Sequence, residues 1–479
     1  MMKGLGHLIR TMFGGKKPAP ALPSYMVGSV ECDQVKAPLA SDDVLRRAMG
    51  AAAGEAAAAE EASRRIYRHE EPVTEVSSLP TLFLHGKPAG QVAIDLQPSM
   101  RLEEEEPSLG APDLLAPISY VELDGPVAPA AEVLLAHRVD AASWREMGEM
   151  GLLLCAVPEE YGGSGGTFAH DCIVFEELAY AGVASFGKSV HNICAHYVEV
   201  YGTEAQKKRW LPQLARGDLV GAIAMSEPSA GSDLQGIRTR AVRSGDGYLL
   251  SGSKTFITNG QVANLLMVVA KTDAAAAAKG ISLMMVETDG LEGFRRGRTL
   301  DKIGMPGQDT SELFFDECRL PADALLGGVE GAGFAQMMDE LPYERTIVAL
   351  YGVAVIERAV RITTEYARER KAFGKTLMEM QNTRFKLAEA ATIAHVGRVF
   401  IDSCIVRYLA GTLDTATASM AKWWLTDMQC QVVDECLQLF GGYGYMREYP
   451  IAQMYADSRV QRIYGGTNEI MKLLIARTL

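Results

Sequence analysis

The sequence predicts an α+β fold, in which helices come first, a small β unit follows and a helical bundle ends the chain. Helical periodicity runs to about residue 220, short apolar runs separated by Gly, Asp and Pro fill residues 221–327, and helical periodicity returns over residues 328–479. The 479 residues exceed the length at which one hydrophobic core stops growing. We therefore expect two or more domains.

Residues 1–110 are predicted to be a poorly ordered N-terminal extension. They contain the stretch KKPAPALP, the alanine tract MGAAAGEAAAAEEA and an acidic run from Glu103 to Glu106. Such a composition buries too little apolar surface to offset the entropy of the chain.

Residues 111–220 are expected to form an N-terminal helical domain. Its clearest segment, ASWREMGEMGLLLCAVPEEYGG, contains a short amphipathic helix that Pro158 and the Gly162–Gly163 turn bring to an end.

Residues 221–327 are expected to form an antiparallel β-barrel or sandwich, with strands at LLMVVAK, ISLMMVET and SELFFDECRL. Within KTFITNG, Phe256 and Thr258 fall on one face of a strand, and Asn259–Gly260 predicts a hairpin turn. The later helices show apolar spacing of i, i+3, i+4 and i+8. One such set, which predicts the face of a bundle helix, is Val396, Val399, Phe400 and Cys404.

Composition excludes several classes of function. A net charge of −13 argues against nucleic acid as the main partner, and no apolar run approaches the roughly 20 residues that span a bilayer. Eight cysteines without a CxxC pair indicate reduced thiols in a reducing compartment. We expect the cytoplasm for a bacterial source and the mitochondrial matrix for a eukaryotic one. The chain lacks HExxH, and His191 and His196 are five residues apart, so no metal site is predicted.

Two loops are candidates for ligand binding. The stretch AMSEPSAGSDLQGIRTRA is rich in small hydroxyl residues, which can offer donors to a planar heterocycle or a pyrophosphate. In IYGGTNEIMKLL, two glycines precede a helix start, where bare N–H groups suit the oxygens of a ligand. Taken alone, the first stretch could equally be a polar turn and the second a plain loop-to-helix junction.

Five motifs together carry a specific resemblance. AMSEPSAGSD, KTFITNG, RKAFGK, LQLFGGYGYMREYPI and IYGGTNEI occur in this order, and residues 130–479 resemble the acyl-CoA dehydrogenases. The resemblance implies a helical N-terminal domain, a middle β domain and a C-terminal four-helix bundle. It also implies FAD as cofactor and α,β-dehydrogenation of an acyl-CoA thioester to the trans-2-enoyl-CoA. Electron-transfer flavoprotein would take the electrons, and the protein would be a homo-oligomer, either a dimer or a tetramer.

The resemblance also implies roles for individual residues. Ser226 and Ser232 would face the flavin and its pyrophosphate, Phe256 would lie against the isoalloxazine, and the Thr258 hydroxyl would approach flavin N5. The residues implied to hold FAD from a neighbouring subunit are Arg370, Phe373, Gln438, Gly441 and Gly442. Thr467 and Glu469 would lie near the cofactor. The residues implied to contact the substrate are Ser232, Arg345, Tyr464 and Gly465.

The reaction needs a base for the Cα proton of the thioester. Common members of the family carry a glutamate at the position that Gly465 occupies here. Either the chain is a catalytically dead relative, or the base comes from another helix, as in the long-chain and isovaleryl members. Glu344, directly before Arg345 in LPYERTIVA, matches that second pattern. Burial in an acyl pocket would raise its pKa. We therefore expect Glu344 to be the base and the Gly465 N–H to polarise the thioester carbonyl.

The likeness is strongest to the long-chain type, although acyl length depends on pocket depth, which a sequence does not show. The segment before Ala130 does not match the long first helix of the family, which leaves open whether the N-terminal helical domain is complete. Two alternatives remain at this point. One is an acyl-CoA oxidase that uses O₂, and the other is a flavin-free helical scaffold that binds a partner.

Overall fold

The computed structural model divides the chain into a unit of residues Gly4–Pro126 and a unit made mainly of Val127–Leu479. It describes residues 83–84, 87–88, 139–183 and 185–479. In the first unit, β1 (Phe83–Leu84) pairs antiparallel with β2 (Lys87–Pro88). Apart from these four residues, the predicted N-terminal extension lies outside the described part of the chain. Everything below concerns residues 139–479.

The first helical region contains four α-helices. They are α5 (Ala141–Glu149), α6 (Phe168–Tyr180), α7 (Lys188–Tyr201) and α8 (Glu204–Arg216). Local signals set their ends: Thr203 and Gln206 form a capping box at the start of α8, and Gly217, with φ +72°, ends it. Trp144 and Met147 of α5 are buried, as predicted for an amphipathic helix, but α5 ends at Glu149, before the predicted end at Pro158 and Gly162–Gly163.

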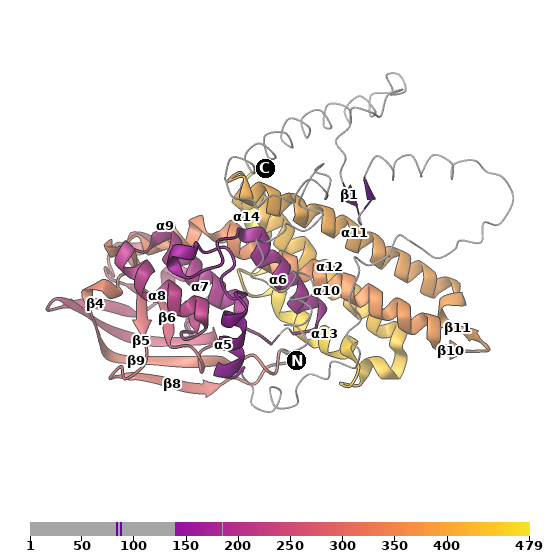
Figure 1. Ribbon diagram of the computed structural model, residues 1–479, viewed down its shortest axis with the longest axis horizontal. Helices are drawn as coiled ribbons and strands as arrows, with labels where there is room; N and C mark the ends of the chain where they lie inside the picture. Colours follow the sequence, from indigo (N-terminus) through magenta and orange to yellow (C-terminus); the bar gives the residue numbers. More distant parts are fainter. Residues whose placement is uncertain (1–82, 85–86, 89–138, 184) are drawn as a thin grey trace, which may run out of the picture. The chain divides into compact units, whose positions relative to one another are not determined.

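A seven-stranded sheet follows, in the order β3-β6-β4-β5-β9-β8, with β7 paired to β6 (Figure 1). Its strands are β3 (Gly221–Ala224), β4 (Arg240–Ser244), β5 (Gly247–Thr258), β6 (Leu265–Lys271), β7 (Ile281–Glu287), β8 (Phe294–Thr299) and β9 (Thr310–Leu320). The three predicted strands are thus confirmed as β6, β7 and β9. Most pairings are antiparallel, but β3 runs parallel to β6. Continuous apolar runs suit β6 and β7 because nearly all their residues are buried.

The predicted hairpin at Asn259–Gly260 is wrong. The chain does turn there, but β5 pairs with β4 and β9, not with β6, the next strand along the chain. The Asn259 side chain explains the difference. It is buried, and its Nδ2 donates to the carbonyl oxygens of Gly187, at 3.0 Å, and Gly221, at 3.1 Å. The turn is therefore fastened to the start of α7 and to β3, and it redirects the chain instead of closing a hairpin.

The C-terminal region is helical, and its core lies between α10, α11 and α12. Its helices are α9 (Gly333–Asp339), α10 (Leu341–Glu369), α11 (Gln381–Leu409), α12 (Thr415–Phe440), α13 (Pro450–Ser458) and α14 (Asn468–Ala476). A short ribbon of β10 (Lys371–Ala372) and β11 (Lys375–Thr376) joins α10 to α11 (Figure 1). The predicted order of helices, sheet and helices is confirmed.

The predicted core face of α11 is only partly right. Cys404 is buried, but Val396 and Val399 are 49% and 50% exposed. The face that packs inward has small residues at Ala390, Ala394 and Gly397, where α11 lies close to its neighbours. A Cβ added to Gly397 would stand 2.7 Å from the Leu425 side chain and 3.3 Å from that of Val353. Apolar spacing alone does not distinguish this tightly packed face from the apolar stripe beside it.

Several further features bear on function. The seven cysteines of the described chain form no disulfide. No helix in residues 139–479 is long and apolar enough to cross a membrane. Over the same residues, no group of His, Cys, Asp and Glu side chains is arranged to hold a metal ion.

Candidate active site

The serine-rich loop after β3 is fastened to the sheet by a buried ion pair. Lys254 of β5 is fully buried, and its Nζ donates to the Met225 carbonyl and to Glu227 Oε1, both at 2.9 Å. Burial lowers the pKa of Lys254 to about 8, although Glu227 acts against that shift. The Ser226 carbonyl accepts a hydrogen bond of 3.0 Å from the Thr255 N–H. The loop that contains Ser226 is therefore held against the strand that carries Phe256.

Phe256 has the properties of a side chain that contacts a flat ligand. The register of β5 shifts between Lys254 and Ile257, so the strand bulges at this point. Phe256 has φ +61°, a conformation that costs roughly 1–2 kcal/mol, and its side chain is 69% exposed. Thr258, two residues on, is partly exposed, and Ser232 is exposed on the preceding loop. An aromatic ring presented to solvent by a strained backbone suits stacking on a planar heterocycle.

A second group of predicted residues lies at the C-terminal end of α10. Arg370, Gln438, Gly441 and Gly442 line one cavity of about 560 Å³. A Cβ added to either glycine would meet nothing within 4 Å, so the backbone there borders open space. Phe373, at the tip of the β10–β11 ribbon, is 97% exposed and has φ +55°. The structure therefore brings together the arginine, the glutamine and the two glycines that the sequence predicts to hold a cofactor.

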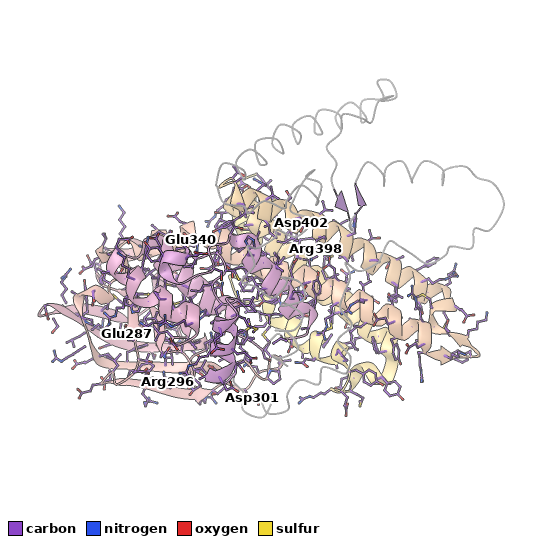
Figure 2. All side chains as sticks on the ribbon, in the orientation of Figure 1. Glu287, Arg296, Asp301, Glu340, Arg398 and Asp402 are labelled. Carbon is purple, nitrogen blue, oxygen red and sulfur yellow. The ribbon has the colours of Figure 1, made fainter. Side chains whose placement is uncertain are left out.

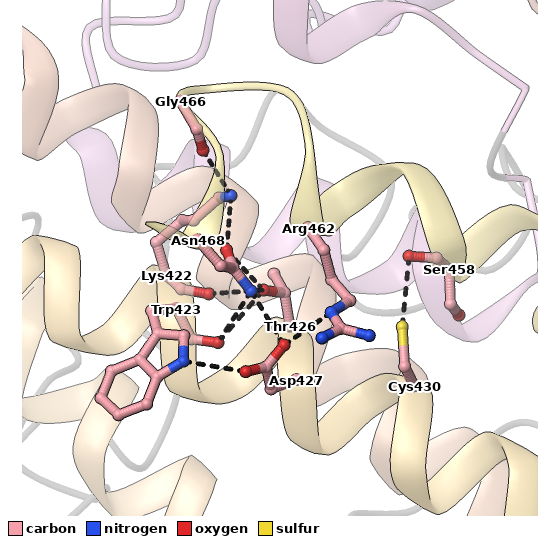
Figure 3. Close-up of polar contacts among 9 residues, drawn as sticks. All are labelled: Lys422, Trp423, Thr426, Asp427, Cys430, Ser458, Arg462, Gly466 and Asn468. Carbon is pink, nitrogen blue, oxygen red and sulfur yellow. Dashed lines mark hydrogen bonds and ion pairs between the residues drawn. The ribbon is translucent and has the colours of Figure 1, made fainter. Parts of the chain in front are cut away.

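The third group is the loop before α14. Gly465 and Gly466 have φ +66° and +87°, values that favour glycine. Lys422 of α12, which is fully buried, donates from Nζ to the Gly466 carbonyl at 2.7 Å and to Asn468 Oδ1 at 2.8 Å (Figure 3). Burial and the neighbouring Arg345 charge lower the pKa of Lys422 to about 8. Thr467 Oγ1 accepts from the Ile470 N–H, which caps α14.

Further bonds tie this loop to α12. Asn468 Nδ2 donates to Asp427 Oδ1 at 3.0 Å, and the same oxygen lies 2.6 Å from the guanidinium of Arg462. The other Asp427 oxygen accepts from Trp423 Nε1 at 2.8 Å (Figure 3). The sequence analysis did not identify Lys422 or Asp427, because both lie within an ordinary helical pattern. The network leaves the Gly465–Gly466 backbone little freedom to move.

Position 465 faces the first turns of α10. A Cβ added to Gly465 would meet only Val348 Cγ2, at an ordinary 3.7 Å, whereas a Cβ at Gly466 would clash with Met471 Cε at 2.7 Å. Val348 lies one helical turn after Glu344, on the same face of α10. Val348, on the same face of α10 as the predicted base, is therefore the nearest neighbour of a side chain built at position 465.

Glu344 is partly buried in the first turn of α10. Its Oε1 accepts a hydrogen bond of 2.9 Å from the hydroxyl of Tyr197 on α7. Burial raises the pKa of Glu344 to about 7, although the Tyr197 bond and the Arg345 charge oppose the shift. Arg345 itself is buried, donates to Ser419 Oγ at 3.0 Å, and has a pKa lowered to about 10 by burial.

Glu340, the residue that caps the N-terminus of α10, is in a different electrostatic state. Its carboxylate lies 2.7 Å from His196 Nε2 and accepts a 2.7 Å bond from the Tyr201 hydroxyl. These bonds outweigh burial and hold the pKa of Glu340 below its usual value. Burial also opposes the charge on His196, but Glu199 and Glu340 raise its pKa to about 9. Of the two carboxyl groups, only Glu344 is suited to exchange a proton near neutral pH.

The other predicted substrate and cofactor residues of this loop are accessible. Tyr464 and Glu469 are both exposed, and Glu469 lies in the first turn of α14.

A buried cluster of charged side chains lies elsewhere, between α10 and α11. Arg398 of α11 lies against Glu357 of α10 at 2.7 Å and against Asp402 at 3.5 Å, and Figure 2 labels Arg398 and Asp402 on α11. This cluster joins helices and does not line the cavity of about 560 Å³.

Comparisons with known proteins match this architecture. The family models described as acyl-CoA dehydrogenase N-terminal, middle and C-terminal domains match residues 123–218, 222–318 and 331–479. The mitochondrial long-chain specific acyl-CoA dehydrogenase of Mus musculus is 49% identical over 347 residues, which cover 72% of this chain and 80% of that protein. The mitochondrial isovaleryl-CoA dehydrogenase of Solanum tuberosum is 36% identical over 71% of this chain and 82% of its own length.

Solved structures are similar as well. The acyl-CoA dehydrogenase from Geobacillus kaustophilus superimposes with a TM-score of 0.71 at 46% identity, over 73% of this chain and 92% of that one. The butyryl-CoA dehydrogenase from Megasphaera elsdenii gives a TM-score of 0.69 at 35% identity, with the same two coverages.

Proposed function

Because the chain belongs to the acyl-CoA dehydrogenase family, whose members are FAD-dependent enzymes, we propose that it dehydrogenates an acyl-CoA thioester to the trans-2-enoyl-CoA with Glu344 as base. One observation carries the assignment of the base. Burial raises the pKa of Glu344 to about 7, and Val348, one turn later on the same face of α10, is the nearest neighbour of the open position at Gly465. The alternative is a catalytically dead relative, and flavin reduction by acyl-CoA that slows in Glu344→Gln would exclude it.

The residues present fit FAD. The exposed Phe256 suits the flat face of the isoalloxazine, and the loop of Ser226 and Ser232 offers hydroxyl and N–H donors. Arg370 can grip two diphosphate oxygens at once, beside glycines that let a ligand approach the backbone. When bound, FAD supplies the acceptor for the hydride that leaves Cβ.

The protein groups handle the proton and the developing negative charge. Near neutral pH a substantial fraction of Glu344 is ionised, so its carboxylate can take the Cα proton of the thioester. The Gly465 N–H can donate to the thioester oxygen as enolate charge develops, and Lys422 keeps that backbone fixed. Tyr464, next to Gly465 in the chain, and Arg345, next to Glu344, are the proposed substrate contacts. Electron-transfer flavoprotein is the proposed electron acceptor.

The placement of the two groups on α10 supports a homo-oligomer. Glu344 and Arg370 lie at opposite ends of this helix, roughly 39 Å apart at 1.5 Å per residue, which exceeds the length of an extended flavin dinucleotide. Arg370 therefore serves a cofactor whose reacting ring lies in another subunit. An exposed apolar stripe on α11 gives a second copy a surface to cover. The stripe consists of Phe385, Val396, Val399 and Val406.

Arg370→Ala is expected to weaken FAD binding by about 10- to 100-fold, because a charge-assisted hydrogen-bond pair to phosphate is lost. The ratio of FAD to chain after dilution and gel filtration with light scattering would measure both cofactor retention and subunit number. Arg368→Ala is the matched control, since Arg368 is exposed in the same turn but does not line the cavity. A monomer that retains one FAD per chain would contradict the shared site.

The proposed activity is tested by adding acyl-CoA to the purified protein without oxygen. We expect a bound flavin spectrum that bleaches on addition of the thioester, and we expect the best substrate to be a long acyl chain, as the likeness to long-chain relatives suggests. A colourless protein would favour a binding scaffold, and stoichiometric peroxide after admission of air during turnover would favour an oxidase.

The mitochondrial relatives lead us to propose the matrix for a eukaryotic source and the cytoplasm for a bacterial one.

A further inference from the structure

Two parallel hydrogen bonds join α7 to α10 next to the proposed base. Tyr197 donates to Glu344 Oε1 at 2.9 Å, and Tyr201, one turn later on α7, donates to Glu340 Oε1 at 2.7 Å. The two tyrosines are four residues apart on one face of α7, and Glu340 caps the N-terminus of α10 four residues before Glu344. Glu340 has a second partner in His196. Glu344 does not: within the described chain, its Oε2 has no hydrogen-bond donor.

Tyr197 is held rigidly. Its side chain is fully buried, so the ring cannot change rotamer without displacing its neighbours. Two buried contacts anchor α7 on its earlier turns: Lys188 Nζ lies 2.9 Å from Asp171, and the His191 Nε2 lies 3.1 Å from the Leu214 carbonyl. Burial raises the pKa of the Tyr197 phenol well above its usual value, so the hydroxyl keeps its proton and can donate at any working pH.

We propose that Tyr197 is a positioning residue for the base: its hydroxyl fixes Oε1 of Glu344 and leaves Oε2 as the oxygen that takes the substrate proton. The inference rests on the proposed role of Glu344. A carboxylate on a flexible side chain has several rotamers, and a bond to one oxygen selects the one that presents the other to the substrate.

The bond has a consequence for protonation. A phenol that donates to a carboxylate stabilises the ionised form and therefore lowers its pKa. The other groups that act on Glu344 are Arg345 and Glu340 on its own helix and His196 on α7. All three remain in Tyr197→Phe. Loss of the hydroxyl should therefore raise the pKa of Glu344 by on the order of one unit.

The test compares Tyr197→Phe with Tyr201→Phe in the full-chain protein. Each variant loses one hydroxyl from α7 and one bond to α10, but only the first loses its bond to the base. The first readout is the infrared band of the protonated Glu344 carboxyl, assigned by its absence in Glu344→Gln and titrated with pH. The second is the pH profile of flavin reduction by acyl-CoA in a single turnover.

In Tyr197→Phe, the infrared midpoint and the acid limb of the rate profile should both move up by about one pH unit. At a pH below both midpoints the rate should fall about tenfold beyond any loss seen at high pH. Tyr201→Phe should leave both midpoints in place, because His196 still pairs with Glu340. An unmoved midpoint in Tyr197→Phe, or an equal shift in Tyr201→Phe, would overturn the inference.

If Tyr197→Phe does not fold, incorporation of 3-fluorotyrosine at position 197 gives the same information. Its hydroxyl is a stronger donor of nearly the same size, so both midpoints should move down, and unmoved midpoints would again overturn the inference. Failure of the proposed function looks different. In that case Glu344→Gln itself would reduce flavin at the unmodified rate, whatever the tyrosine variants do.

Discussion

Glu344→Gln is expected to slow flavin reduction by bound acyl-CoA by about 10²- to 10⁴-fold, the usual cost of removing a general base. Glutamine keeps the size of the side chain and can still accept the Tyr197 bond, but it cannot take the Cα proton. The flavin content should stay unchanged, because Glu344 lies at the opposite end of α10 from Arg370. Anaerobic stopped-flow absorbance of the flavin measures the rate directly.

Glu340→Gln is the matched control for this substitution. It makes the same chemical change one turn away on the same helix, at a carboxylate that His196 and Tyr201 already hold. We expect its rate of flavin reduction to remain within a few-fold of the unmodified protein. If Glu344→Gln reduced flavin as fast as Glu340→Gln, the base would have to be another acid.

The second large effect concerns the buried ammonium beneath the Gly465–Gly466 loop. Lys422→Met keeps the length of the side chain but leaves the Gly466 carbonyl without its donor, and Asn468 Oδ1 keeps only the Thr426 hydroxyl at 3.3 Å. An unpaired buried acceptor costs about 1–3 kcal/mol, so the free energy of unfolding should fall by at least about 1–3 kcal/mol. Urea denaturation measures this loss. Flavin reduction should slow as well, since the backbone that contacts the thioester is no longer fixed.

Lys472→Met is the control, because it also replaces a lysine in a helix by methionine, but at an exposed position. Lys472 lies on α14, is exposed, and contacts the face of Trp423 at 4.9 Å from the ring centroid. An exposed contact of this kind contributes roughly 0.5–1 kcal/mol. If Lys422→Met were no less stable than Lys472→Met, the proposed anchor of the loop would be wrong.

The order of secondary structure could be predicted because its signals are local. Continuous apolar runs identified β6, β7 and β9, and the periodic stretches identified the long helices. The errors have tertiary causes. Asn259 looked like a hairpin residue, but its amide bonds to Gly187 and Gly221 and sends the chain elsewhere. On α11, apolar spacing predicted that Val396 faces the core. In the structure Val396 is exposed, and Gly397 lies at the close contact with the neighbouring helices.

The candidate site was predictable where a motif or a missing side chain marked it. Glu344 emerged from the sequence only because Gly465 lacks the carboxylate that the family usually has there. Tyr197 and Lys422 left no such signal. Each lies in a helix with no motif around it, and each acts through a partner that is distant in sequence: 147 residues away for Tyr197 and 44 for Lys422. Only the packing of α7 on α10 and of α12 on the loop reveals them.

The central claim is that Glu344 and position 465 face the same substrate proton. The most direct measurement is single-turnover flavin reduction by Gly465→Glu in the Glu344→Gln background. A side chain at 465 has room, with Val348 at 3.7 Å, although φ +66° costs a residue other than glycine roughly 1–2 kcal/mol. We predict that the double variant recovers part of the rate that Glu344→Gln loses, with a changed preference for acyl length. A double variant that binds FAD and acyl-CoA normally but reduces flavin no faster than Glu344→Gln would contradict the account.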